Sequence, residues 1–232
     1  MNTYSIAGLL VNMECLGKSA IQAEKYLTDF TETPDITLKV KDELVENLSK
    51  QHSELSQDDC LYIYLSKYLN AALLDFDCFV LHSSAVAYEN NAYLFSADSG
   101  TGKSTHTNLW KQVFESAKII NDDKPAIRLI NGSFYACGTP FSGSSPLNEN
   151  ICIPLKAICF LERGEENKIE QISDKKTVIY KLLSQTLRRA GNDKTLKLME
   201  LLDKLIEKTP VYKLTCLPNE DAAILAHKIM SK

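Results

Sequence analysis

The stretch Ala92-Tyr-Leu-Phe-Ser-Ala-Asp-Ser-Gly-Thr-Gly-Lys-Ser-Thr105 decides the fold expected for this chain. Its apolar start predicts a short strand, its glycines predict a turn, and a helix is expected from Lys103 onward. The spacing of a phosphate-binding loop, with Ala in place of the usual first Gly, occurs at Ala97, Gly102, Lys103 and Ser104. The stretch therefore predicts nucleotide binding. An ordinary Gly-rich turn between a strand and a helix is the alternative.

The residue types in this loop fit phosphate chemistry. Gly100 and Gly102 allow positive φ and a close approach of the backbone to a ligand. Successive N–H groups and the positive end of the helix dipole then attract an anion. Lys103 can reach the β- and γ-phosphates, and the Ser104 hydroxyl can bind Mg²⁺. Further contacts to the nucleotide are expected from Asp98, Ser99, Thr101 and Thr105.

Composition narrows the choice of partner and compartment. The 232 residues are 44% hydrophobic and carry a formal net charge of −4, which gives no electrostatic reason to expect a nucleic-acid or membrane partner. No apolar run approaches the roughly 20 residues needed to cross a bilayer, and Met1–Met13 does not resemble a secretory signal. The seven cysteines are scattered and lack a CxxC pair. We expect reduced thiols in a cytoplasmic protein, with neither a disulfide framework nor a zinc site.

Two parts are expected along the chain. Residues 1–57 carry no chemical motif and are predicted to form an α/β segment that packs on the core. Residues 58–232 are predicted to form the domain that holds the phosphate loop. Within it, consecutive hairpins replace a regular β-α-β alternation, which predicts a mixed, largely antiparallel sheet with flanking helices. These hairpins are expected at 78–96, 126–137 and 154–172.

Three further sites flank the loop. Asp122 and Asp123 follow a short strand, and this carboxylate pair suits a Mg²⁺ partner and a general base; a plain turn is the alternative. His82 is expected in mid-strand, where a lone histidine is usually structural. The segment 138–145 is small, hydroxyl-rich and flanked by glycines. It is predicted to be either a mobile substrate loop or a surface connection.

Three features follow one another along the chain. These are His82, the loop ADSGTGKS at 97–104, and NDDKPA at 121–126. In these features and in their order, the chain resembles the kinase domain of the HPr kinase/phosphorylase family. That family belongs with the ATP-dependent phosphoenolpyruvate carboxykinases. The likeness covers roughly residues 78–172 and is greatest to HPr-kinase-related proteins, some of which phosphorylate a serine of a ribosomally made peptide. Two departures are visible. Gly138-Thr-Pro-Phe-Ser-Gly143 stands where HPr kinase has an Arg-Gly-x-Gly segment, and residues 1–57 match no part of its N-terminal domain.

The resemblance implies a P-loop serine kinase that uses ATP and Mg²⁺. It implies that Lys103 binds phosphate, that Ser104 and Asp122 bind the metal, and that Asp123 is the catalytic base, with His82 near the active site. His82, Arg128 and Arg163 are candidates for stabilising charge in the transition state. The expected acceptor is a hydroxyl of a peptide, protein or small molecule, and a homo-oligomer is left open. Two alternatives remain, a nucleotide-binding regulatory module without catalysis and a phosphoenolpyruvate carboxykinase-like metabolic enzyme.

Overall fold

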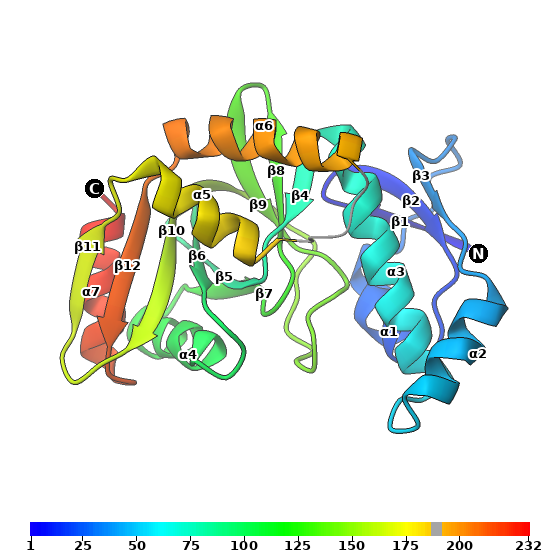
Figure 1. The fold of residues 1–232 in the computed structure, drawn as a ribbon, viewed down its shortest axis with the longest axis horizontal. Coiled ribbons are helices and arrows are strands. Elements are labelled where there is room, and N and C mark those ends of the chain that lie inside the picture. The colour runs from blue at the N-terminus through cyan, green and yellow to red at the C-terminus, as the bar shows by residue number, and fades with distance from the viewer. Residues whose placement is uncertain (187–191) are drawn as a thin grey trace.

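The computed structural model describes residues 1–186 and 192–232 and contains two sheets (Figure 1). The smaller sheet and three helices form the N-terminal unit, at the right of Figure 1. Its elements are β1 (Asn2–Ile6), β2 (Leu9–Met13), α1 (Gly17–Ala23), β3 (Ile36–Leu38), α2 (Asp42–Gln51) and α3 (Gln57–Leu73). Short 3₁₀ helices follow α1 and α3, at Glu24–Tyr26 and Leu74–Phe76.

The apolar face of α3 packs on the N-terminal strands. Tyr62, Leu65 and Leu69 are buried in one cluster with β1 and β2 residues such as Ile6 and Val11. Removal of these side chains from water is the main stabilisation of this unit. The division of the chain into 1–57 and 58–232 stays a prediction.

The larger sheet has nine strands and mixed direction, which confirms the expected mixed α/β fold. Along it lie β4, β8, β9, β10, β6, β5 and β7, with β12 against β10 and β11 against β12. The strands are β4 (Cys78–Val80), β5 (Ser83–Tyr88), β6 (Asn91–Ser96), β7 (Lys118–Asn121), β8 (Ala126–Ile130), β9 (Ser133–Cys137), β10 (Cys152–Arg163), β11 (Lys168–Gln171) and β12 (Val211–Cys216). The helices are α4 (Lys103–Val113), α5 (Lys175–Ser184), α6 (Asn192–Lys208) and α7 (Glu220–Met230).

The carboxyl ends of several strands lie on the same side of this sheet. β6 and β12 both pair in parallel with β10, so the three carboxyl ends point the same way. β7 also runs parallel to β6, because each is antiparallel to β5. Loops after the carboxyl ends of such strands are the usual place for a ligand in α/β folds.

Helices cover both faces of the strands around β6. Trp110 of α4 and Ala226 of α7 are fully buried with Phe95 on one face. Leu182 of α5 and Leu201 of α6 are buried with Leu94 on the other. Because successive strand residues point to opposite faces, the apolar run of β6 fills both layers. β6 is thereby fixed as the central strand that leads into the loop at 97–102.

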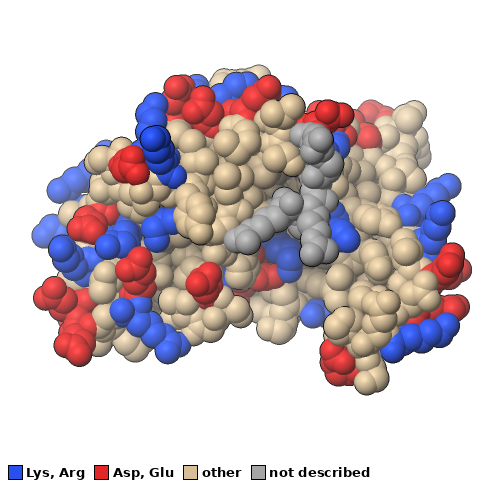
Figure 2. Space-filling model, in the orientation of Figure 1, with Lys and Arg blue, Asp and Glu red and all other residues tan. Residues whose placement is uncertain are grey.

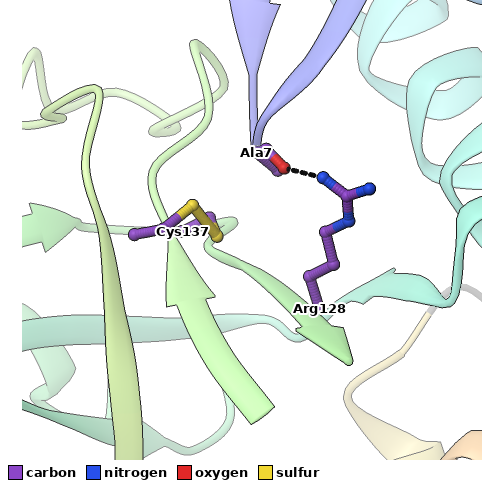
Figure 3. The surroundings of a disulfide bond; sticks show 4 residues. Ala7, Arg128 and Cys137 are labelled. Carbon is purple, nitrogen blue, oxygen red and sulfur yellow. Dashed lines mark hydrogen bonds between the residues drawn. A yellow bond between two sulfur atoms is a disulfide. The ribbon is translucent and has the colours of Figure 1, made fainter. Parts of the chain in front are cut away.

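Two expectations about strand pairing and the cysteines are wrong. The predicted hairpin at 154–172 does not form, because β12 lies between its two strands and β11 pairs with β12. Cys137 and Cys152 are not free thiols but form a disulfide (Figure 3). They are direct cross-strand partners on β9 and β10, with 4.1 Å between their Cα atoms, a pairing that only the strand register reveals. The other five cysteines are free.

Acidic and basic side chains are interspersed over the face of the molecule shown in Figure 2. Among the described residues, no helix is both long and apolar enough to cross a membrane.

Candidate functional site

The loop between β6 and α4 has the backbone expected of it. Gly100 and Gly102 have φ of +78° and +124°, and a Cβ on either would meet no atom within 4 Å. These glycines are therefore required for their left-handed conformation and not for crowding inside the protein. α4 begins at Lys103 without a side-chain cap. Its first N–H groups have no partners within the helix, so they can serve as donors to an anion.

Lys103 is folded back under this loop. Its Nζ donates to the carbonyl oxygens of Ala97 and Asp98, at 2.9 and 3.4 Å. Burial lowers the pKa of Lys103, while the charges of Asp123, Asp98 and Asp122 act in the opposite direction. The ammonium group therefore lies within reach of the loop interior and is held there by main-chain oxygens.

Asp122 follows β7 at the sheet edge and is 8% exposed. Its Oδ1 accepts a hydrogen bond from Ser84 Oγ at 2.7 Å, and Ser84 in turn contacts Thr107 of α4. Within the described residues, Oδ2 has no hydrogen-bond partner. Asp122 is thus oriented by β5 and α4 and keeps one oxygen for a ligand.

Asp123 is paired with two basic side chains. His82 Nε2 lies 3.2 Å from its Oδ1, and Lys124 Nζ contacts its Oδ2. Burial raises the pKa of Asp123, but the hydrogen bond from His82 and the charge of Lys124 outweigh it, so that the pKa falls to about 2. His82 is oriented through Nδ1, which lies 2.9 Å from Gln185 Oε1. Asp123 is therefore ionised at neutral pH and held in place.

The position of His82 differs from the prediction. It does not lie within a strand but in the break between β4 and β5, where its N–H donates to the Gln185 carbonyl. This break turns the ring toward Asp123. A sequence run of strand-forming residues could not reveal it, because the break depends on contacts with the segment after α5.

The segment 138–145 is largely buried and is not a plain surface connection; its role as a substrate loop stays a prediction. Phe141 is 1% exposed and its ring lies edge-on to that of Tyr62, with centroids 5.2 Å apart. Gln22 Nε2 donates to the Ser145 carbonyl, and the Gly143 N–H donates to Tyr62 Oη. Residues of α1 and α3 thus hold this segment over Asp123, a role that the sequence did not indicate.

A cavity of about 310 Å³ brings most of the predicted residues together. We call it the central cavity, and it is lined by His82, Ser99, Gly100, Gly102, Lys103, Ser104, Thr105, Asp122, Asp123 and Ser142–Ser145. Asp98 and Thr101 lie on the other side of the loop and line adjoining cavities.

The two candidate arginines lie outside the central cavity. Arg128 points to the N-terminal hairpin, where its Nη1 donates to the Ala7 carbonyl at 2.6 Å (Figure 3). Arg163, at the end of β10, holds the loop by donating to the carbonyl oxygens of Gly100 and Thr101. Neither contacts Asp122 or Asp123, so neither is placed to stabilise charge between them.

The donor set suits a magnesium ion that shares its ligands with a phosphate. The described residues contain no group of three His, Cys, Asp or Glu side chains that could hold a metal by themselves. Mg²⁺ is usually bound through one or two carboxylates, waters and substrate phosphates. Ser104 and Asp122 line the same cavity and would provide the protein's share.

Comparison with known proteins adds a distant structural likeness. No protein-family model matches this chain, and no curated protein matches it in sequence. The chain is similar to the solved structure of the Hpr(Ser) kinase/phosphatase from Coxiella burnetii, with 10% identity and a TM-score of 0.39. The match covers 66% of this chain and 93% of that one. A likeness this distant carries no conclusion about activity.

Proposed function

We propose that this chain is an ATP-dependent, Mg²⁺-requiring P-loop kinase that transfers the γ-phosphoryl group to a hydroxyl, with a serine side chain as the favoured acceptor. One observation carries the proposal. Lys103, Ser104, Asp122 and Asp123 line a single cavity at the carboxyl ends of β6 and β7. Phosphoryl transfer needs the phosphate neutralised, the acceptor in line and a group to receive its proton, and little else from the protein.

The loop and Lys103 bind the phosphates in this proposal. The N–H groups at the start of α4 and the Lys103 ammonium offset the negative charge of the phosphate oxygens. Ser104 and Asp122 would hold Mg²⁺, which when bound neutralises charge on the phosphates. Arg163 supports the loop from outside through Gly100 and Thr101.

Asp123 orients the acceptor. Its low pKa keeps the carboxylate ionised, so it accepts a hydrogen bond from the acceptor hydroxyl. The proton passes to Asp123 only as the hydroxyl oxygen forms its bond to phosphorus. His82 and Lys124 keep the carboxylate in position. The Asp pair favours catalysis over a purely regulatory role, for which phosphate binding alone would suffice.

The acceptor enters from the side of segment 138–145 in this account. Ser142–Ser145 line the central cavity together with the loop, and Gly143 lies against Asp123. Three features stay predictions. They are the nature of the acceptor as a peptide, protein or small molecule, the formation of a homo-oligomer, and the cytoplasmic location.

The test uses ATP labelled in its γ-phosphate. The purified protein is incubated with Mg·ATP and a lysate of the source organism, and phosphorylated species are separated and identified. We expect label on a hydroxyl-bearing species with the wild-type protein and none with Lys103→Ala. Equal labelling with both proteins would contradict the proposal.

A further inference from the structure

A second cavity adjoins the loop on the side away from Asp123. It has a volume of about 390 Å³, within the range of small-molecule sites. We call it the outer cavity. Gly100, Gly102 and Thr105 line both it and the central cavity. A ligand that binds to the loop in the central cavity can therefore extend along these shared residues into the outer cavity.

The walls of the outer cavity are largely apolar. Leu109 of α4, Leu161 of β10 and Leu217 after β12 line it from three elements. Leu217 is 38% exposed, so part of its apolar surface is open to a ligand. A flat apolar group between these side chains would gain by removing their surface from water.

One side chain that lines this cavity has a buried ring nitrogen without a partner among the described residues. His106 is 3% exposed and lines the outer cavity. Trp110 Nε1 donates to its Nε2 at 3.2 Å, whereas its Nδ1 has no hydrogen-bond partner among the described residues. Because Nε2 accepts from Trp110, the ring proton is on Nδ1.

A buried N–H without a partner lowers the stability of the folded protein unless a ligand or a water molecule accepts a hydrogen bond from it. The heteroaromatic base of a nucleotide combines an apolar plane with ring nitrogens and carbonyl oxygens that accept hydrogen bonds. From the apolar walls, the unpartnered donor and the shared loop residues, we infer that the outer cavity binds the base of the nucleotide, with His106 Nδ1–H donating to an acceptor on its edge.

A third cavity, of about 600 Å³, is a weaker candidate for the base. It shares Arg163 with the outer cavity and lies against α5, and polar residues such as Lys181, Ser184 and Gln185 line it. Unlike the outer cavity, it contains no buried donor without a partner among the described residues.

The inference rests on the proposed nucleotide binding, and the test separates the two. Calorimetric titration compares Mg·ATP with Mg·tripolyphosphate, which lacks the base. We expect ATP to bind at least about tenfold more tightly. Equal affinities would overturn the base site and leave phosphate binding intact. Binding of neither ligand would overturn both proposals.

Two variants of His106 sharpen this test. His106→Leu removes the donor and should weaken ATP binding by between about fivefold and a hundredfold, with tripolyphosphate binding unchanged. His106→Gln is the matched control, since its amide can accept from Trp110 and still donate to the base. It should retain most of the affinity for ATP. Equal losses for both ligands, or equal ATP affinity in both variants, would contradict the assignment.

Cys216 provides a readout in the unaltered protein, which matters if His106→Leu fails to fold. Cys216 is a half-buried free thiol that lines the outer cavity. Adenosine without phosphates should slow its alkylation, as measured by mass spectrometry. Cys15, a half-buried free thiol outside this cavity, is the internal control. Unchanged alkylation of Cys216 at saturating adenosine, or equal slowing at Cys15, would contradict the inference.

Discussion

Gly143 lies directly against Asp123: a Cβ added to Gly143 would stand 3.0 Å from the carboxylate carbon of Asp123. Gly143 also has φ of +69°, a conformation that other residues rarely adopt. Segment 138–145 therefore lies close against Asp123, and any larger residue at position 143 would be both crowded and strained.

Gly143→Ala should displace Asp123 and slow phosphoryl transfer by about 10- to 100-fold. The matched control is Gly132→Ala, in the turn between β8 and β9. Gly132 has a φ of +81°, but an added Cβ would meet nothing closer than Lys208 Nζ at 4.0 Å. Both variants should lose a few °C in Tm, equivalent to about 1 kcal/mol of backbone strain. Equal transfer rates in the two variants would show that the contact with Asp123 is irrelevant to catalysis.

Lys103→Ala should abolish most of the rise in Tm that Mg·ATP produces in the wild type. Ligand binding to the folded state stabilises it by mass action, and Lys103 supplies a charge for the phosphates. Differential scanning fluorimetry with and without Mg·ATP measures this shift. Lys111→Ala, at the exposed end of the same helix, should keep the full shift. A large drop in Tm of nucleotide-free Lys103→Ala would instead mean that Lys103 is structural.

Tyr62→Phe should weaken binding of the acceptor more than binding of the nucleotide. Its hydroxyl accepts from the Gly143 N–H and donates to Gln22 Oε1, so its loss frees the segment over Asp123. We expect the KM for the acceptor to rise several-fold and the KM for ATP to stay nearly constant. The expected loss of stability is about 1–2 kcal/mol. Similar small changes in both constants would limit Tyr62 to a structural role.

The free energy of unfolding should decrease as the pH is lowered, because His106 is buried in its neutral form. Its folded-state pKa, about 4, lies below its ordinary value of 6.5, because burial disfavours the charged ring. The unfolded chain therefore binds the proton more readily. The contribution of His106 is fully present above about pH 6.5 and is lost as the pH falls toward 4. It amounts to about 3 kcal/mol.

Urea unfolding of the wild type and His106→Gln between pH 7 and 4 measures this contribution. The difference in free energy of unfolding should shrink by about that amount across the range. A difference independent of pH would show that His106 does not titrate as its burial requires.

Local patterns in the sequence predicted much of the sheet. The bounds of β8 and β9 agree with the predicted hairpin, because the Asn131-Gly132 turn has the left-handed φ values that this turn type needs. The glycines at 100 and 102 likewise have positive φ. These features depend on residues close together in the chain, which is why periodicity and turn chemistry reveal them.

Features that depend on distant segments were not predictable. β12 separates β11 from β10, although nothing in 154–172 indicates a third strand. The Cys137–Cys152 disulfide follows from strand register. Arg128 contacts Ala7 in the turn between β1 and β2, and Gln22 holds Ser145. The catalytic and metal-binding roles assigned to Lys103, Ser104, Asp122, Asp123 and His82 stay predictions, although these residues line one cavity.

The most direct test of phosphoryl transfer is the labelling assay with Asp123→Asn. Removal of a general base costs about 10²–10⁴-fold in rate, and Asn keeps the shape of the side chain. Asp123→Asn should bind Mg·ATP almost as the wild type does, yet transfer the γ-phosphate to its acceptor at least about a hundredfold more slowly. Asp122→Asn should weaken Mg·ATP binding as well. A single-turnover rate near that of the wild type in Asp123→Asn would contradict the account.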